Sequence, residues 1–97
     1  FSATLARGAL FVASDMMGAG AVQALASAGR RVPEDVAVVG FDDSIAAVYA
    51  NPPLTTIRQH VEDMAAAAVE SLLAGTADPG RRPAFDCDLV VRASTAP

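Results

Sequence analysis

The stretch of residues 36–43 constrains the fold of this 97-residue chain more than any other segment; it reads Val-Ala-Val-Val-Gly-Phe-Asp-Asp. Five of its first six residues are apolar, and three of them are valines. Such a short apolar run is typical of a strand buried on both faces, as in a parallel sheet. Because ligands bind beyond the carboxyl ends of strands in open parallel sheets, Asp42 and Asp43 are the leading candidates for function.

A second apolar segment, residues 9–13, predicts another strand, and residues 16–28 carry the apolar spacing of a helix. Strand, helix and strand make a βαβ unit, whose strands are parallel, so Ser14-Asp15 should open onto the same sheet edge as the two later acids. Short oxygen-bearing side chains cap helices. We therefore interpret Asp15 as the helix cap and Ser14 as a polar group that faces ligand.

The rest of the chain alternates between short extended segments and helices. Residues 44–50 predict a short helix with Asp43 as a plausible N-cap, and residues 54–57 are extended. Residues 61–74 form an almost continuous apolar helical stripe, and residues 84–92 predict a last strand. Two long helices cannot cover both faces of such a sheet, so we expect part of a larger α/β domain.

Composition and charge exclude several classes of protein. A hydrophobic content of 53% with 19% charged residues indicates a globular chain. Eleven acids against seven arginines and no lysine, a net charge of −4, make it a poor candidate to grip nucleic acid by itself. The longest apolar runs, 45–50 and 64–69, are far shorter than the ~20 residues of a membrane span. We expect neither a membrane segment nor a signal peptide in these residues.

The paired acids leave several functions open. One acid can cap a helix while the other is solvated, or one can accept hydrogen bonds from a ligand; we favour Asp42 for ligand because it is nearer the strand end. Acids at strand ends also suit Mg²⁺ in phosphoryl transfer, but that chemistry needs a cation, and we expect no arginine near these strand ends. His60 has no partner at metal-ligand spacing and Cys87 no sign of thiolate activation. We therefore expect no enzyme, metal or cofactor.

Four motifs occur in a fixed order along the chain. They are Ala-Ser-Asp-Met-Met-Gly-Ala-Gly-Ala at 13–21, Gly-Arg-Arg-Val-Pro-Glu-Asp-Val at 29–36, Val-Gly-Phe-Asp-Asp at 39–43 and Pro-Pro-Leu-Thr-Thr-Ile-Arg-Gln at 52–59. Together they resemble the C-terminal part of the effector-binding domain of lactose-repressor-family (LacI/GalR) transcription regulators. The resemblance runs from about Phe11 to Ser94.

This resemblance implies a two-lobed, periplasmic-binding-protein-like (type I) α/β fold that holds a sugar or another small metabolite between its lobes. Residues 9–57 and 84–94 would belong to the C-terminal lobe, and helix 61–74 to the N-terminal lobe. The DNA-reading helix-turn-helix of the family lies upstream of this sequence, so operator DNA would be bound only by the intact protein. The implied function is effector sensing in a dimeric, cytoplasmic repressor.

The resemblance also assigns individual residues. Asp42 matches the acid that binds effector hydroxyls or amides, and Ser14 stands where many members have an effector-binding asparagine. Gln59 and Val61 match positions that line the cleft, and Asp15 matches the helix cap. Dimer contacts would come from Ile45, Val48 and Tyr49. The alternative is a secreted sugar-binding protein of a transporter with the same fold. The motifs Val-Pro-Glu-Asp-Val and Pro-Pro-Leu-Thr-Thr favour the regulator.

Overall fold

The parallel strand pair at the base of the fold is formed by the two apolar segments of the sequence. In the computed structural model, which describes residues 8–75 and 85–96, β1 (Gly8–Phe11) pairs with β2 (Val36–Val39) in parallel, with Gly8 opposite Val36 and Phe11 opposite Val39. Helix α1 (Asp15–Ser27) connects them. The predicted βαβ unit is confirmed, and of its two strands β2 supplies the core, since every residue of β1 is exposed.

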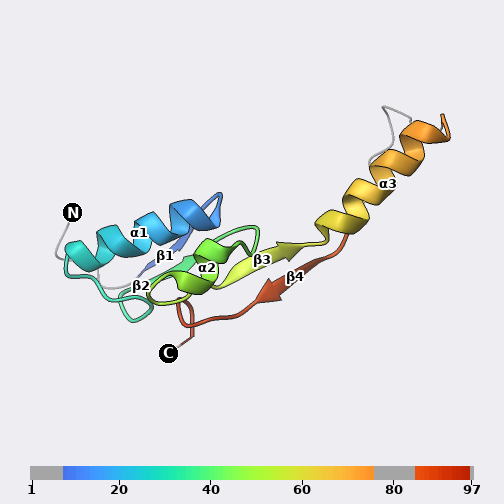
Figure 1. Ribbon diagram of the computed structural model, residues 1–97. Helices are drawn as coiled ribbons and strands as arrows, with labels where there is room; N and C mark the ends of the chain where they lie inside the picture. The colour runs from blue at the N-terminus through green and yellow to red at the C-terminus, as the bar shows by residue number, and fades with distance from the viewer. Residues whose placement is uncertain (1–7, 76–84, 97) are drawn as a thin grey trace.

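The core lies between this strand pair and the helices packed on it. Its buried members come from α1, from β2, from the short helix α2 (Ile45–Tyr49) and from the segment that follows α2; they are Val22, Val36, Val38, Ala47 and Leu54. Thr55 forms a parallel bridge to Val39, so the chain returns alongside β2. Helices α1 and α2 lie next to each other beside the strand pair, as Figure 1 shows.

A two-stranded arm leaves this body and ends in a helix. Strands β3 (Thr56–Gln59) and β4 (Cys87–Val90) pair antiparallel, and α3 (Val61–Leu73) lies at the far end of the arm (Figure 1). The longest extent is 57 Å and the radius of gyration 17.4 Å, against about 12–13 Å for a compact chain of this length. None of the residues of α3 is buried. The arm therefore carries an amphipathic helix away from the core.

The predicted elements are all present, with ends shifted by at most three residues. Helix α1 starts at Asp15 and not at residue 16, and the extended segment predicted at 54–57 becomes a strand at Thr56–Gln59. The start of the last predicted strand, residue 84, lies outside the described residues. No helix in the described part of the chain is long and apolar enough to span a membrane.

The prediction that Asp15 caps α1 is wrong. Ser14 is the N-cap: its backbone is extended, with φ −153° and ψ 161°, and its Oγ accepts from the Met17 amide at 3.2 Å. Asp15 is the first helical residue instead, and its side chain points into the protein, where it is 1% exposed. The proposed cap of the next helix is also wrong, because Ser44 occupies that position while Asp43 binds arginines.

Candidate functional site

The carboxyl ends of β1 and β2 meet at one edge of the fold, as expected for parallel strands. The Val12 amide donates to the Val39 carbonyl at 2.9 Å, and the Asp15 amide donates to the Phe41 carbonyl at 3.1 Å. The start of α1 and the turn after β2 are therefore side by side. This contact brings the segment 14–15 to the turn that holds the two acids.

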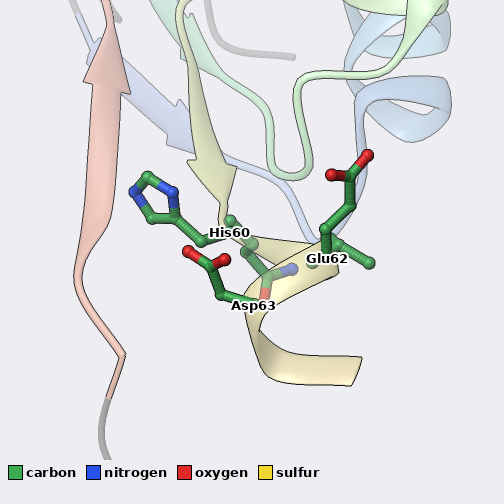
Figure 2. Close-up of a pocket in the computed structure, with 5 residues that line it drawn as sticks. His60, Glu62 and Asp63 are labelled. Carbon is green, nitrogen blue, oxygen red and sulfur yellow. The ribbon is translucent and has the colours of Figure 1, made fainter. Parts of the chain in front are cut away.

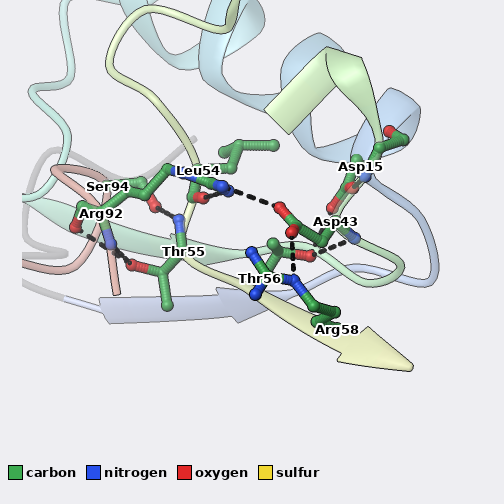
Figure 3. A network of polar contacts seen from close by, with 9 residues as sticks. Asp15, Asp43, Leu54, Thr55, Thr56, Arg58, Arg92 and Ser94 are labelled. Carbon is green, nitrogen blue, oxygen red and sulfur yellow. Dashed lines mark hydrogen bonds and ion pairs between the residues drawn. The ribbon is translucent and has the colours of Figure 1, made fainter. Parts of the chain in front are cut away.

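The carboxylate of Asp15 joins three segments of the chain. Its Oδ1 accepts from Thr56 Oγ1 at 2.6 Å; both residues are labelled in Figure 3. Its Oδ2 accepts from the Ser44 amide at 2.5 Å. A Cβ at Gly40 would overlap Asp15 Oδ1, so only glycine allows this approach. Asp15 is thus a buried structural acid that fixes the turn after β2 against β3.

Asp42 is exposed and is held by β3 rather than by its own strand. Its amide donates to the Ile57 carbonyl at 2.8 Å, and its Oδ1 accepts from Gln59 Nε2 at 2.9 Å. Its φ of 112° lies in a region that L-residues rarely adopt. Such backbone conformations persist where the surroundings hold them, and they concentrate at functional sites. The remaining oxygen of Asp42 can accept hydrogen bonds from a ligand.

A pocket of about 320 Å³ opens at the end of β3 and the start of α3. Its lining consists of Gln59, His60, Val61, Glu62 and Asp63. Figure 2 shows that Glu62 points to the opposite side from His60 and Asp63. The His60 Nε2 atom lies 3.3 Å from Asp88 Oδ2 on the neighbouring strand β4. The structure thus brings Gln59 and Val61 into one pocket and connects it to Asp42 through Gln59.

The side chain of Ser14 is half-buried beside the turn, and its Oγ accepts from the Met17 amide. A hydroxyl that accepts one bond still has a proton to donate and a second lone pair. Capping and ligand binding are therefore compatible at Ser14. Its role toward a ligand stays a prediction.

Asp43 lies between two guanidinium groups, which contradicts the expectation that no arginine is near the acids. Arg58 Nε donates to its Oδ2 and Arg92 donates to its Oδ1, both at 2.8 Å (Figure 3). Burial raises the pKa of Asp43, but the hydrogen bonds from Arg92 and Arg58 outweigh it and leave the pKa below its ordinary value. Both arginines are therefore already paired with a carboxylate.

A buried hydroxyl network closes the body around the return segment, and sequence reasoning missed it. Ser94 Oγ donates to the Val38 carbonyl at 2.6 Å and accepts from the Thr55 amide at 2.8 Å. Thr55 Oγ1 lies 2.5 Å from Thr95 Oγ1, and it accepts from the Arg92 amide at 2.8 Å. The signal was two threonines inside a short apolar segment, Leu-Thr-Thr-Ile, which need buried partners.

The apolar residues predicted at a dimer contact are exposed on α2. Ile45, Val48 and Tyr49 keep 74%, 50% and 78% of their surface accessible. No group of three or more His, Cys, Asp or Glu side chains within residues 8–75 and 85–96 could hold a metal ion.

The sequence matches the Periplasmic binding protein-like domain family over residues 3–95. Among curated relatives, the HTH-type transcriptional regulator MalR of Streptomyces coelicolor is 50% identical over 91 residues, covering 91% of this chain and 26% of that protein. The chain therefore spans about a quarter of the length of this relative. The family match covers both acids and all of strand β3.

Solved structures show the same likeness. The transcriptional regulator CelR in complex with cellobiose has a TM-score of 0.73 and 46% identity, and the match covers 89% of this chain and 27% of CelR. The lac repressor dimer bound to operator and the anti-inducer ONPF has a TM-score of 0.74 and 36% identity, with 90% and 27% covered. The first of these proteins is a regulator with a bound sugar, and the second is a repressor bound to operator DNA and a small molecule.

Proposed function

This chain belongs to the LacI/GalR family of transcription regulators, and from that premise we propose that it is the effector-sensing part of a DNA-binding repressor. The effector is a small hydroxylated molecule, in the first place a sugar. Operator DNA is bound by a helix-turn-helix outside these residues, and the intact regulator works in the cytoplasm. Because the relatives are transcription regulators, a phosphotransfer enzyme is set aside.

One observation carries the proposal: Asp42 presents a carboxylate beside a pocket, held in place from strand β3. Gln59 donates to one oxygen and leaves the other to accept from ligand hydroxyls. Charge-assisted hydrogen bonds of this kind are about twice as strong as neutral ones. Ser14, the N-cap of α1, supplies a second polar group, and Val61 supplies an apolar wall. This combination suits the polar edges and apolar faces of a sugar ring.

We propose that residues 9–57 and 84–94 form the C-terminal lobe and that helix 61–74 belongs to the N-terminal lobe. Two findings support this division. Helix α3 has no buried residue, although Val69, Leu72 and Leu73 are among its apolar side chains, so its apolar face needs a cover from elsewhere. The strands β3 and β4 run antiparallel between the body and this helix, as a pair of crossovers would.

We further propose that the regulator is a homodimer whose contacts include Ile45, Val48 and Tyr49. These apolar side chains are exposed together on one short helix, which is uncommon on a surface without a partner. Ligand in the cleft shifts the equilibrium between two lobe arrangements, and the dimer passes the shift to the DNA-binding part. Differential affinity worth ~1–3 kcal/mol is enough for such coupling.

The test is to remove the Asp42 carboxylate from the intact regulator without straining the turn. Alanine would be strained at φ 112°, so the variants are Asp42→Asn, which keeps an acceptor for Gln59, and Asp42→Gly, which suits the backbone. Sugar binding is measured by calorimetry and operator binding by fluorescence anisotropy.

We expect both variants to lose the response to sugar, by about 100-fold in affinity or more, while operator affinity without sugar stays at the wild-type level. A loss of this size corresponds to one charge-assisted hydrogen-bonding group. Wild-type induction in both variants would remove Asp42 from the site and refute the proposal.

A further inference from the structure

The turn that carries the two acids is attached to β3 by every residue of that strand. Ile57 accepts from the Asp42 amide, and Gln59 donates to the Asp42 carboxylate. Thr56 Oγ1 accepts from the Asp43 amide at 3.2 Å, and Arg58 donates to the Asp43 carboxylate at 2.8 Å. Four successive residues of β3 therefore hold the turn, alternating between its two acids.

The backbone of the turn needs this support. Asp42 has φ 112° and Asp43 has φ 54°, so two consecutive non-glycine residues are in the positive-φ region. Residues in such sparsely populated regions stay there only when neighbouring groups over-determine their conformation. The position of the Asp42 carboxylate therefore depends on β3 and not on β2 alone.

Asp43 extends this attachment to the second strand of the arm. Arg92 follows β4 and donates from Nη2 to Asp43 Oδ1 at 2.8 Å, while its Nη1 donates to the Leu54 carbonyl at 3.1 Å. The Asp43 side chain is 10% exposed and that of Arg92 is 19% exposed. One largely buried carboxylate thus ties both strands of the arm to the turn at the end of β2.

We propose that Asp43 is a positioning residue for Asp42, and that its pairs with Arg58 and Arg92 couple the orientation of the arm to the ligand-binding carboxylate. The proposal rests on the proposed function of Asp42. A change in the angle of the arm relative to β2 pulls on the turn through Arg58 and Arg92, and so moves Asp42. Conversely, a ligand bound to Asp42 favours one orientation of the arm.

Arg58 is the best residue for a test because its side chain is 52% exposed, so its replacement leaves no buried gap. Arg58→Gln removes the charge from one side of Asp43, and Arg58→Lys keeps it. The matched control is Arg31→Gln, which breaks the ion pair between Arg31 and Asp35. Arg31 is also an exposed arginine, and it is remote from the turn. All variants are made in the intact regulator.

The first measurement is hydrogen–deuterium exchange without ligand, compared between peptides spanning residues 40–45 and 34–39. We expect Arg58→Gln to speed exchange in residues 40–45 about fivefold, with Arg58→Lys close to wild type and residues 34–39 unchanged. Unchanged exchange in residues 40–45 of Arg58→Gln would overturn the proposal, whether or not a ligand is known.

The second measurement is binding of cellobiose, maltose, sucrose and glucose, together with the urea midpoint. A positioning role predicts about fivefold weaker sugar binding in Arg58→Gln, partial rescue in Arg58→Lys and no effect in Arg31→Gln, all at unchanged midpoints. A lowered midpoint with wild-type affinity would show a merely structural pair and overturn it. If Asp42→Asn and Asp42→Gly also bind sugar with wild-type affinity, the proposed function fails as well. If Arg58→Gln binds with wild-type affinity while the Asp42 variants do not, this inference fails alone.

Discussion

The buried hydroxyl of Thr56 offers the sharpest test of how the site is built. Thr56 is 0% exposed, and its Oγ1 donates to Asp15 Oδ1 at 2.6 Å and accepts from the Asp43 amide. Thr56→Val keeps the shape of the side chain but removes both bonds. One oxygen of a buried carboxylate then has no donor, and one amide of the turn loses its acceptor.

The cost follows from these two losses. A hydrogen bond to a charged group contributes about 1.5–3 kcal/mol, and a neutral one about 0.5–1.5 kcal/mol, so we expect Thr56→Val to lower the free energy of unfolding by about 2–4 kcal/mol. The control is Thr56→Ser, which keeps the hydroxyl and loses one methyl group. Its cost should be about 1 kcal/mol.

The assay is urea unfolding of the intact regulator at pH 7 and fixed protomer concentration, followed by circular dichroism. Fixed concentration matters because assembly contributes to the stability of a dimer. With a slope of about 2–3 kcal/mol/M, the midpoint of Thr56→Val should fall by about 1 M, and that of Thr56→Ser by less than half of this. A valine variant as stable as the serine variant would show that the Asp15–Thr56 bond contributes nothing.

Three further predictions concern Gly40, Gly20 and the charge of Asp43. Gly40→Ala should destabilise the regulator by about 1–3 kcal/mol in the urea assay, because its Cβ would overlap Asp15 Oδ1 and lie 3.3 Å from Asp15 Cα. A Cβ added at Gly20, in α1, would meet no atom within 4 Å, so Gly20→Ala should instead stabilise the regulator by about 0.5–1 kcal/mol. If Gly20→Ala were destabilising and Gly40→Ala stabilising, the result would contradict the geometry. The arginines lower the pKa of Asp43 in the folded protein. The contribution of Asp43 to the stability of the folded protein should therefore be complete above the unfolded-state pKa of ~3.9, and it should be lost as the pH falls through the lower pKa of the folded state. Midpoints of wild type and Asp43→Asn should therefore converge in acid, and a constant difference down to the acid transition would refute this.

The positions of the elements could be predicted because each depends on local pattern. The valines of 36–39 and the helical stripe of 61–73 identify a strand and a helix without knowledge of their neighbours. Parallel pairing followed from the βαβ order, and with it the meeting of the two strand ends. Element ends were less accurate, because backbone hydrogen bonds to distant segments decide where a strand stops.

The partners of the acids could not be predicted, because they come from far along the chain. Arg92 is 49 residues from Asp43, and Thr56 is 41 residues from Asp15. A local rule makes the acid after a strand a helix cap, and it failed at Asp15 because a tertiary contact with Gly40 and Thr56 draws the side chain inward. The ligand roles of Asp42, Ser14, Gln59 and Val61 remain predictions, although Asp42 and Gln59 do meet.

Asp42 and Asp43 have different partners, and this difference has an electrostatic consequence. A guanidinium group bound to a carboxylate competes with ligand hydroxyls for the same oxygens. Asp43 engages Arg58 and Arg92, so that in the described part of the chain the carboxylate of Asp42 is hydrogen-bonded only by the neutral amide of Gln59. The positive φ angles at both residues turn adjacent side chains to different surroundings, one exposed and one largely buried. Removing Asp43 would therefore do more than loosen the turn: it would release two cations beside the site, and Asp42 would be the nearest acid in sequence to receive them.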